Sequence, residues 1–254
     1  MTTQLTINGK SVTAAEGQTL LEVARAADIE IPTLCHHEAL EARGACRLCT
    51  VELTNPKWPG WKRLVASCVY PAQAGLVVKT STPEIQELRT VLVDLLLARC
   101  PETEAIVALA EQYGIEQTSF ERRVEDDRCI LCGLCVRACE QGIGAFAIGV
   151  SGRGAVKRVG PAYGQPAEAC VGCASCAHVC PTGAIPVVDE GGRRTIWNRT
   201  FQLERCAACG SPTLPTEQID HMAGRSKLAR AYFELCDDCR RRKTADHWNA
   251  VMGR

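Results

Sequence analysis

The chain has 254 residues, of which 46% are hydrophobic and 5% aromatic, so a core can form in one large domain or in several small ones. Its 29 basic and 29 acidic residues balance, which argues against a protein that holds nucleic acid through phosphate contacts. The N-terminus has no apolar signal-peptide core, and no stretch reaches the roughly 18 uninterrupted apolar residues of a membrane span. Seventeen cysteines in such a chain indicate a cytoplasmic metal-binding protein rather than a disulfide-bonded one.

Residues 1–80 predict a small domain of β-strands and one helix. Apolar residues alternate around Asn8-Gly9, which indicates a β-hairpin, and TLLEVARAADI (residues 19–29) has apolar residues at helical spacing. A long loop then carries the first set of four cysteines, Cys35, Cys46, Cys49 and Cys68. This order suggests a β-grasp ferredoxin domain, and a long cysteine loop closed by a distant fourth cysteine is typical of [2Fe–2S] ligation.

The same loop contains other candidate functional residues. His36 and His37 could be ligands, because a Rieske centre uses two histidines, but four cysteines already complete the set and favour histidines in a polar loop. Gly44 is small, as a backbone that wraps a cluster requires. The stretch NPKWPGWKR indicates a surface loop, and its Trp58 and Trp61 are candidate partner contacts.

Residues 81–125 predict a helical linker. Apolar residues recur there at helical spacing, at Ile85, Leu88, Leu92, Leu95 and Leu96. Cys100 stands outside every set, and we expect a buried thiol because nothing around it in the sequence would lower its pKa.

Residues 126–190 contain an internal repeat. CILCGLCVRACE (129–140) and CVGCASCAHVCP (170–181) share the pattern C-x2-C-x2-C-x3-C, offset by 41 residues. Three cysteines of each copy can hold three irons of a [4Fe–4S] cluster, and the C-x3-C step carries the fourth towards the other cluster. We therefore expect one cluster on Cys129, Cys132, Cys135 and Cys180 and the other on Cys170, Cys173, Cys176 and Cys139. Zinc knuckles and free thiols are the disfavoured alternatives.

The two copies differ after the last cysteine. Pro181 follows the second copy, as in bacterial ferredoxins, whereas Glu140 takes that position in the first. Proline there shapes a turn and is not a ligand, so its replacement costs no coordination.

Residues 191–254 form a tail with a fourth set of cysteines, Cys206, Cys209, Cys236 and Cys239. Paired C-x2-C motifs fit a structural tetrahedral zinc site, and four thiolates could also hold a third [4Fe–4S] cluster. Disulfides are disfavoured in a cytoplasmic chain. Residues 216–235, between the pairs, look helical in their second half. The tail has 12 basic and 7 acidic residues, which indicates a solvated or partner-facing surface.

The predicted fold class is α+β, with a β-grasp [2Fe–2S] domain, a helical linker, a two-[4Fe–4S] ferredoxin domain and a small four-cysteine metal module in that order. This order resembles the N-terminal part of the large iron–sulfur subunit of respiratory complex I. It also resembles the small diaphorase subunit of NAD-reducing bidirectional [NiFe] hydrogenases and related subunits of formate dehydrogenases and [FeFe] hydrogenases. The residues that carry the resemblance lie within about 1–190: IPTLCHHEALEARGACRLCTVEL, RCILCGLCVRACEQGIGAFAIGVSGRG and EACVGCASCAHVCPTGAI.

The sequence departs from this family at three places, one of which is the 18-residue separation of Cys49 and Cys68. The family has a His-x3-Cys-x2-Cys-x5-Cys cluster between the two ferredoxin parts, but residues 81–125 contain no histidine and one cysteine, so we expect that cluster to be absent. The Cys206–Cys239 tail is not part of the family pattern and leaves the partner complex open.

The resemblance implies a non-catalytic electron-transfer subunit. It would relay single electrons between a flavin- and NAD(H)-binding diaphorase subunit and a catalytic subunit such as a [NiFe] hydrogenase, and a formate dehydrogenase is an alternative partner. GIGAFAIG (142–149) lacks the strand context of a nucleotide-binding loop, so flavin and catalytic metal are expected on other chains. A free-standing ferredoxin-like carrier and a metal-stabilised regulatory protein are the remaining hypotheses.

Overall fold

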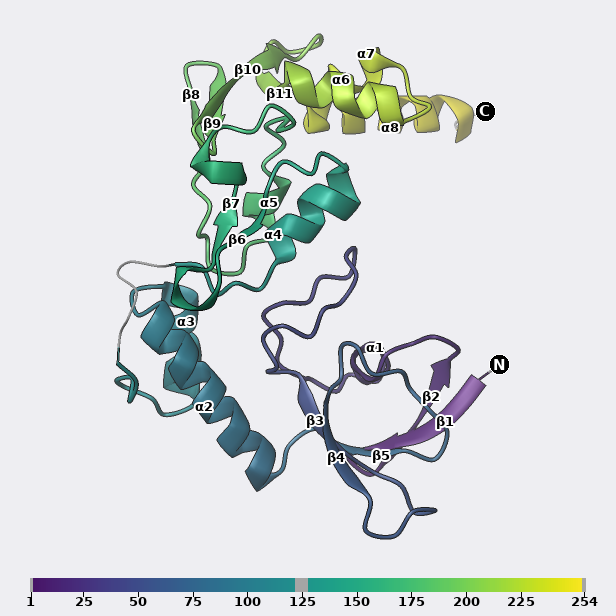
Figure 1. Cartoon of the computed structure of the whole chain (residues 1–254). Helices are drawn as coiled ribbons and strands as arrows, with labels where there is room; N and C mark the ends of the chain where they lie inside the picture. Colours follow the sequence, from purple (N-terminus) through teal and green to yellow (C-terminus); the bar gives the residue numbers. More distant parts are fainter. Residues whose placement is uncertain (1, 122–127, 253–254) are drawn as a thin grey trace.

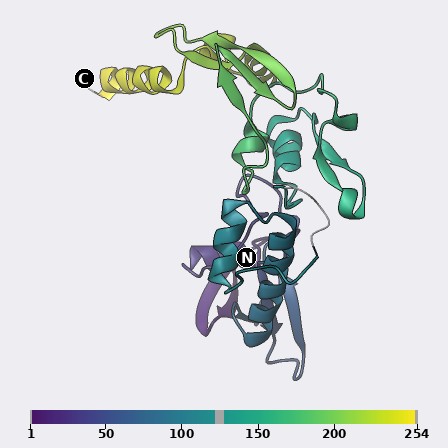
Figure 2. The ribbon, with the colours of Figure 1, turned by 90° about the vertical axis from the view of Figure 1, so that its left-hand side faces the viewer.

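The computed structural model describes residues 2–121 and 128–252. Four parts follow one another along an elongated molecule, from an N-terminal sheet at one end to a C-terminal helix at the other (Figure 1). Figure 2, turned by 90°, shows the same succession, with the cysteine-rich part between the N-terminal half and the tail. Within the described ranges, no helix has both the length and the apolar character that a bilayer crossing needs.

The first part is a mixed sheet of five strands in the order β2-β1-β5-β3-β4. The strands are β1 (Thr2–Ile7), β2 (Lys10–Ala15), β3 (Thr50–Thr54), β4 (Lys62–Ala66) and β5 (Val77–Lys79), and only the β1–β5 pair among them is parallel. The predicted hairpin is confirmed. Asn8 and Gly9 take φ values of 50° and 82°, which a tight two-residue turn between twisted strands requires.

Helix α1 (Leu20–Ala26) covers this sheet, as the sequence predicted. The Thr19 side chain caps it, and the Glu22 carboxylate accepts a hydrogen bond from the Thr19 backbone N–H, so the chain is fixed where it leaves the sheet. Leu20 and Leu21 are fully buried against the sheet. This core carries Cys49 and Cys68 at its edge.

The described part of the predicted helical linker is helical, as α2 (Pro83–Arg99) and α3 (Glu104–Gln112), whereas residues 122–125 of that prediction lie outside the described residues. The face of α2 that is buried differs from the predicted stripe. Buried positions recur every fourth residue, at Ile85, Arg89, Val93 and Leu97, whereas Leu95 is 45% exposed. Cys100, at the end of α2, is fully buried, in agreement with the prediction.

Arg89 explains why α2 turns that face inward. Its guanidinium is buried and donates to the carbonyls of Leu48 (2.9 Å) and Thr50 (3.0 Å), on either side of Cys49. Burial lowers the pKa of Arg89 from its usual value, because desolvation disfavours the charged form. The helix is therefore attached to the first cysteine loop through two buried hydrogen bonds.

The internal repeat is visible in the backbone of the third part. In each copy the second and fourth residues after the first cysteine have positive φ: Leu131 (55°) and Gly133 (71°), then Gly172 (69°) and Ala174 (59°). Each loop then enters a short helix, α4 (Leu134–Arg137) or α5 (Ser175–His178). The left-handed residues turn the chain around the cysteine side chains before each helix begins.

The difference between Glu140 and Pro181 has a structural consequence. In the first copy α4 continues as a π-helix (Ala138–Ile143), which ends at Gly144 with φ of 72°. In the second copy Pro181 follows Cys180 and the helix has already stopped at His178. As a result, the backbone N–H that approaches the last cysteine comes from eight residues on in the first copy and four residues on in the second.

The remaining elements complete this part and form the tail. Hairpin β6 (Gly149–Ser151) and β7 (Arg158–Gly160) lies between the copies, with 3-10 turns η2 (Gly154–Val156) and η3 (Ala162–Gly164). The tail sheet has the order β11-β10-β9-β8, from β8 (Val188–Glu190), β9 (Arg193–Ile196), β10 (Arg199–Arg205) and β11 (Pro212–Pro215). Helices α6 (Thr216–Arg225), α7 (Arg230–Phe233) and α8 (Asp237–Met252) follow. The longer helix between the cysteine pairs thus lies in the first half of 216–235, so the prediction for the second half holds only for the single turn of α7.

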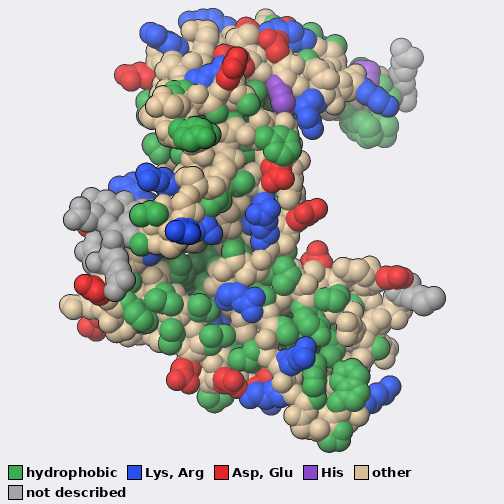
Figure 3. All heavy atoms as spheres, viewed as in Figure 1, with side chains coloured by type: hydrophobic (Ala, Val, Ile, Leu, Met, Phe, Trp, Pro, Cys, Tyr) green, Lys and Arg blue, Asp and Glu red, His purple; other side chains and the backbone are tan. Residues whose placement is uncertain are grey.

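The surface carries mixed charge. On the face drawn in Figure 3, Lys and Arg side chains lie scattered among Asp and Glu, and hydrophobic side chains gather over the lower half. In the loop between β3 and β4, Trp58 is 53% exposed and meets Trp61 edge to face, with ring centroids 5.5 Å apart. Trp61 packs against the N-terminal core, so Trp58 is the tryptophan of this pair that the loop presents to solvent.

Two valines of α2 test its packing. Val93 is fully buried and Val91 is 46% exposed, two residues away on the same helix. We expect Val93→Ala to lower the free energy of unfolding by about 2 kcal/mol, through lost burial and an unfilled cavity. Val91→Ala should change it by less than about 0.5 kcal/mol, since alanine has the higher helix propensity. Denaturant unfolding of both variants measures the difference, and equal effects would contradict the described orientation of α2.

Candidate metal and cluster sites

The first cysteine set lies at the edge of the N-terminal sheet as two pairs of sulfurs. Cys49 and Cys68 have their Sγ atoms 3.4 Å apart, and the Cys35 and Cys46 thiols hydrogen-bond each other. The backbone N–H of Cys46 also donates to Cys35 Sγ at 3.3 Å. A [2Fe–2S] cluster needs two thiolates on each of its two irons, so this pairing fits the group.

Within each pair, the two thiols differ in pKa. The hydrogen bond with Cys35 lowers the pKa of Cys46 to about 6, and the same bond raises the pKa of Cys35. The hydrogen bond with Cys68 likewise lowers the pKa of Cys49 to about 6 and raises that of Cys68. Each pair can therefore offer one thiolate near neutral pH, which is the form that binds metal.

The two histidines of the loop make other contacts. His36 Nδ1 lies 3.2 Å from Arg25 Nη1, and burial lowers the pKa of its imidazole. His37 Nδ1 accepts from the backbone N–H of Ala39 at 3.2 Å. These contacts support the preference for cysteine over histidine as ligand in this set.

The second set surrounds a cavity of about 280 Å³. Its lining contains Cys129, Cys132 and Cys135 from the first copy and Cys180 from the second, together with Ile130 and Ile185 among others. The structure thus brings together the four cysteines that the spacing predicted. A cavity lined by four thiols and apolar side chains fits a [4Fe–4S] cluster.

The third set surrounds a smaller cavity lined by Cys139, Cys170, Cys173 and Cys176. Apolar side chains close it, among them Ile148 and Ile196. Trp197 Nε1 donates to Cys176 Sγ at 3.4 Å, and the N–H of Ala147 donates to Cys139 Sγ at 3.3 Å. Here too the fourth cysteine comes from the other copy, as the repeat predicted.

Burial makes these thiols poor free nucleophiles. Desolvation raises the pKa of Cys135 to about 12 and of Cys176 to about 11, and it raises those of Cys132 and Cys170 as well. A bound metal ion deprotonates a coordinating thiol outright, whatever its free pKa. Buried convergent thiols of this kind fit metal ligation better than redox or nucleophilic chemistry of the cysteines themselves.

The first two sets are joined by Arg137, which sequence reasoning missed. This arginine is fully buried. Its guanidinium donates to the carbonyls of Cys35 (2.9 Å) and Glu41 in the first loop, and to those of Cys132 (3.5 Å) and Gly133 (3.3 Å) in the second. One side chain therefore fixes two cysteine loops against each other. The sequence signal that could have revealed Arg137 is its position in CVRAC (135–139), between two candidate cluster ligands.

The third set is held by the β9–β10 hairpin of the tail, another feature that spacing did not reveal. Arg199 donates to the carbonyls of Ala167, Glu168 and Cys170, at 2.9, 2.6 and 2.8 Å. Arg194 donates to the carbonyl of Gly172 at 3.3 Å. The loop that carries Cys170 and Cys173 is thus covered by strands that follow it in the chain.

The fourth set is more compact than the others. The Sγ atoms of Cys206, Cys209, Cys236 and Cys239 all lie within 4.8 Å of one another. Backbone N–H groups approach these sulfurs, with Cys236 N–H donating to Cys206 Sγ at 3.3 Å. That hydrogen bond is the main cause that lowers the pKa of Cys206 to about 6. The set can hold a metal ion.

Two family models match the chain at its cysteine-rich parts. Residues 1–83 match the 2Fe-2S iron-sulfur cluster binding domain family, and residues 122–187 match the 4Fe-4S dicluster domain family. The chain is therefore an iron–sulfur protein that joins a [2Fe–2S] domain to a [4Fe–4S] dicluster domain. The first match includes Cys35–Cys68, the second includes Cys129–Cys180, and both end before Cys206.

Relatives show which iron–sulfur proteins the chain is similar to. The chain is 31% identical to the G 2 subunit of the NADH-quinone oxidoreductase of Rhizobium meliloti over 82% of its length, but it spans only 27% of that relative. It is 28% identical to the gamma subunit of the NAD-reducing hydrogenase HoxS of Cupriavidus necator, with 82% of this chain and 97% of that one covered. A chain in the crystal structure of NAD+-reducing [NiFe]-hydrogenase is similar with a TM-score of 0.62 and 28% identity, over 88% of this chain and 97% of that one.

The resemblance drawn from the cysteine motifs is thereby confirmed. Over most of its length the chain is similar to the iron–sulfur subunits of these two kinds of complex, the G subunits of NADH-quinone oxidoreductases and the gamma subunit of NAD-reducing hydrogenase.

Replacing His36 tests the ligands of the first set. We expect His36→Ala to retain the electron paramagnetic resonance signal of a reduced [2Fe–2S] cluster, because its imidazole contacts Arg25 rather than the cysteine pairs. Cys46→Ser should lose that signal, because one iron would lose a thiolate. Spectra of the two full-length variants, recorded after dithionite reduction, show whether the ligands of this set are cysteines alone. Loss of the signal in His36→Ala would indicate a mixed histidine and cysteine ligation.

Trp197 offers a second test, at the third set. Hydrogen bonds to cluster sulfurs raise the reduction potential, because they stabilise the more negative reduced state. We expect Trp197→Phe to lower the potential of the cluster on Cys139, Cys170, Cys173 and Cys176 by about 40 mV, the equivalent of about 1 kcal/mol for one electron. Redox titration followed by electron paramagnetic resonance measures this reduction potential. Trp58→Phe, on an exposed loop, is the control and should leave the reduction potential of that cluster unchanged.

Proposed function

We propose that this chain relays single electrons between a flavin- and NAD(H)-binding diaphorase subunit and a catalytic subunit such as a [NiFe] hydrogenase. The ligands would be Cys35, Cys46, Cys49 and Cys68 for one [2Fe–2S] cluster, and the two mixed sets Cys129, Cys132, Cys135, Cys180 and Cys139, Cys170, Cys173, Cys176 for two [4Fe–4S] clusters. Iron–sulfur clusters, when bound, supply one-electron transfer without making or breaking substrate bonds.

The observation that carries the proposal is that three cysteine sets adjoin one another in apolar surroundings. Cys35 and Cys132, from the first two sets, share one buried apolar cluster of residues. Cys135 and Cys176, from the second and third sets, share another. Sites in contact through packed apolar side chains are close enough for a relay and are shielded from water, which suits single-electron transfer better than chemistry on a dissolved substrate.

The protein's own residues have two tasks in such a relay. Arg137 and Arg99 hold the second cysteine loop, since Arg99 donates to the carbonyl of Cys129 at 2.7 Å and Arg137 links that loop to the first. Apolar side chains such as Ile130 and Ile185 line the cavity beside the sulfurs and would limit the access of water to a bound cluster. Rigid loops and low water content keep reorganisation small when the local charge changes, because the surrounding dipoles are already fixed.

The partners are inferred from the relatives. One relative is a subunit of an NAD-reducing hydrogenase and others belong to NADH-quinone oxidoreductases, and a partner that oxidises or reduces NAD(H) is common to both names. We infer a cytoplasmic complex in which the flavin and the catalytic metal lie on other chains. A formate dehydrogenase partner remains the alternative.

The test uses the full chain isolated with an affinity tag from its own cells, under anaerobic conditions. We expect about ten irons per chain from the three clusters. We also expect a co-purified flavoprotein and reduction of the cluster signals by NADH in the complex. Cys49→Ser should lose the [2Fe–2S] signal and reduce NADH-dependent electron transfer to benzyl viologen at least about tenfold, if that cluster lies on the path.

Two outcomes would contradict the proposal. Iron near zero after anaerobic purification would exclude electron transfer and favour a regulatory protein with thiolates as scaffold. A monomer with all its iron and no flavoprotein would favour a free-standing carrier instead.

A further inference from the structure

The tail cysteines do not resemble the other three sets in their geometry, and this difference bears on which metal they bind. Among the described residues, they are the one group of three or more potential ligands whose ligand atoms converge within 4.8 Å. Cys209 Sγ and Cys236 Sγ are 3.7 Å apart. Four sulfurs at about 2.3 Å from one zinc ion, at tetrahedral angles, would be about 3.8 Å from one another. Thiolates on a [4Fe–4S] cluster each bind a different iron and stand farther apart.

The backbone around the first tail pair has the form that a zinc knuckle needs. Gly210 has φ of 74° and its N–H donates to the carbonyl of Cys206 at 2.9 Å, which closes a tight turn over the C-x2-C pair. The N–H of Ala207 donates to the carbonyl of Glu234, so the two cysteine-bearing segments are already joined by backbone. The sulfurs therefore converge because the chain holds them there.

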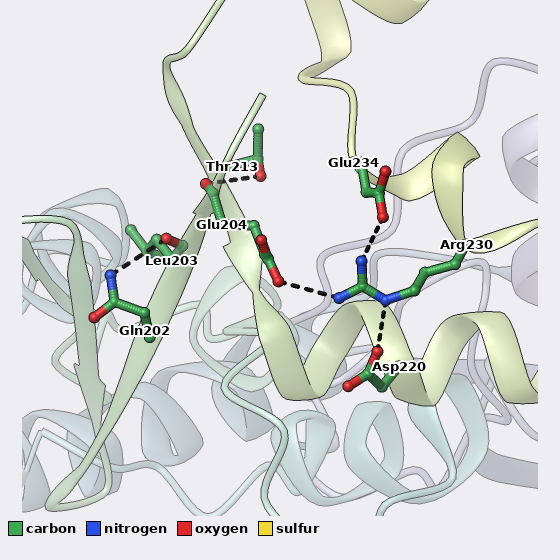
Figure 4. A network of polar contacts seen from close by, with 7 residues as sticks. All are labelled: Gln202, Leu203, Glu204, Thr213, Asp220, Arg230 and Glu234. Atoms are coloured by element: carbon green, nitrogen blue, oxygen red, sulfur yellow. Dashed lines mark hydrogen bonds and ion pairs between the residues drawn. The ribbon is translucent and has the colours of Figure 1, made fainter. Parts of the chain in front are cut away.

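An ion network brings the segments together but cannot hold them alone. Arg230 donates to Glu204 at 3.1 Å, to Asp220 at 2.8 Å and to Glu234 (Figure 4). Glu204 and Glu234 each stand two residues before a cysteine of the fourth set. The Arg230 side chain is 40% exposed, and exposed ion pairs contribute only about 0–1 kcal/mol each. In α8, no residue between Asp237 and Met252 is buried, so no apolar core anchors that helix.

The tail site also lies outside the apolar clusters that join the other sets. Within the described ranges, the buried clusters that contain cysteines of the first three sets include none of the four tail cysteines. Cys209 is exposed, whereas the cysteines of the first three sets are buried or half-buried. This position suits a structural ion better than a relay centre.

The tail is connected to the third cysteine set through β10. At its start, Arg199 holds the loop of Cys170, and Phe201 is fully buried against Gly172 of the same loop. Cys206 follows directly after the strand ends at Arg205. From α6, His221 Nε2 donates to the carbonyl of Ile143 at 2.8 Å, at the end of the π-helix that carries Cys139. The same elements thus touch the tail ligands and the third set.

We propose that Cys206, Cys209, Cys236 and Cys239 bind one Zn²⁺ ion, outside the electron path, and that this ion clamps the tail over the cluster site formed by Cys139, Cys170, Cys173 and Cys176. Zinc keeps one oxidation state, so the ion adds stability without taking part in electron transfer. The clamp rests on the proposed function, because it protects a cluster of the relay. The zinc site itself is independent of the proposed function.

Metal analysis and zinc X-ray absorption on the full chain test the site. The protein is produced with both iron and zinc in the medium and purified anaerobically. We expect about one zinc per chain with four sulfur neighbours at about 2.3 Å, beside about ten irons. The double variant Cys209→Ser/Cys236→Ser should lose the zinc and keep its iron. The reciprocal variant Cys173→Ser should keep the zinc and lose up to about four irons.

The clamp is tested by oxygen sensitivity. In air, we expect the third-set cluster signal of Cys209→Ser/Cys236→Ser to decay at least several-fold faster than that of the wild type, while the [2Fe–2S] signal decays at an unchanged rate. An unchanged decay of both would overturn the clamp. About fourteen irons without zinc in the wild type, or zinc that persists in the double variant, would overturn the zinc site. One zinc with no iron would leave the zinc site standing and overturn the proposed relay instead.

Discussion

The arrangement of the cysteine loops depends on one buried guanidinium. Arg137 is fully buried, and its donors reach the carbonyl of Cys35, 102 positions earlier in the chain, as well as that of Cys132 in its own loop. A buried cation is costly unless its donors are satisfied, so these carbonyls must stay around it. The N-terminal sheet and the repeat part are thus held in a defined relation at the point where their cysteines meet. The shared apolar core and the hydrogen bonds between Glu41 and Gln141 add to this contact, but Arg137 is the buried group that bonds to both cysteine loops.

The same physical problem recurs at each cysteine loop and has the same solution. A loop that wraps around sulfurs points N–H groups inward, as the N–H of Cys46 does towards Cys35 Sγ, and its carbonyls are left without strand or helix partners. Arginine suits these carbonyls because its planar group offers five donors. Arg89 takes two carbonyls beside Cys49, and Arg199 takes three before and at Cys170. Carbonyls on the outer side of each loop thereby gain donors without a bulky covering domain.

The cysteine sets could be predicted from the sequence because metal ligation places cysteines at characteristic spacings, such as the C-x2-C step that occurs in all four sets. The Asn8-Gly9 hairpin and a helix in the region of 83–99 could also be predicted, because their sequence signals are local. The sequence did not reveal that Leu95 faces solvent, because periodicity defines a helix but not which of two adjacent apolar positions meets the core. It did not reveal Arg137 either, since a buried arginine looks like a surface charge until its carbonyl partners, far away in sequence, are known. The absence of a proline after Cys139 permits the helix to continue there, but only the folded backbone shows that it does so as the π-helix Ala138–Ile143.

In our proposal, four thiolates per site serve two purposes in this chain, and the surroundings of each site decide which. In the first three sets, cysteines lie within shared apolar clusters, and in the linker α2 and α3 fill the space with side chains such as Val93 and Ile106, so that Cys35 and Cys132 share one core. The tail sulfurs converge on a single point, beside exposed ion pairs and an unburied helix. Because electron transfer requires proximity and a metal that changes oxidation state, a compact thiolate site outside the apolar path is suited to holding structure, and it lies where the third set needs a cover.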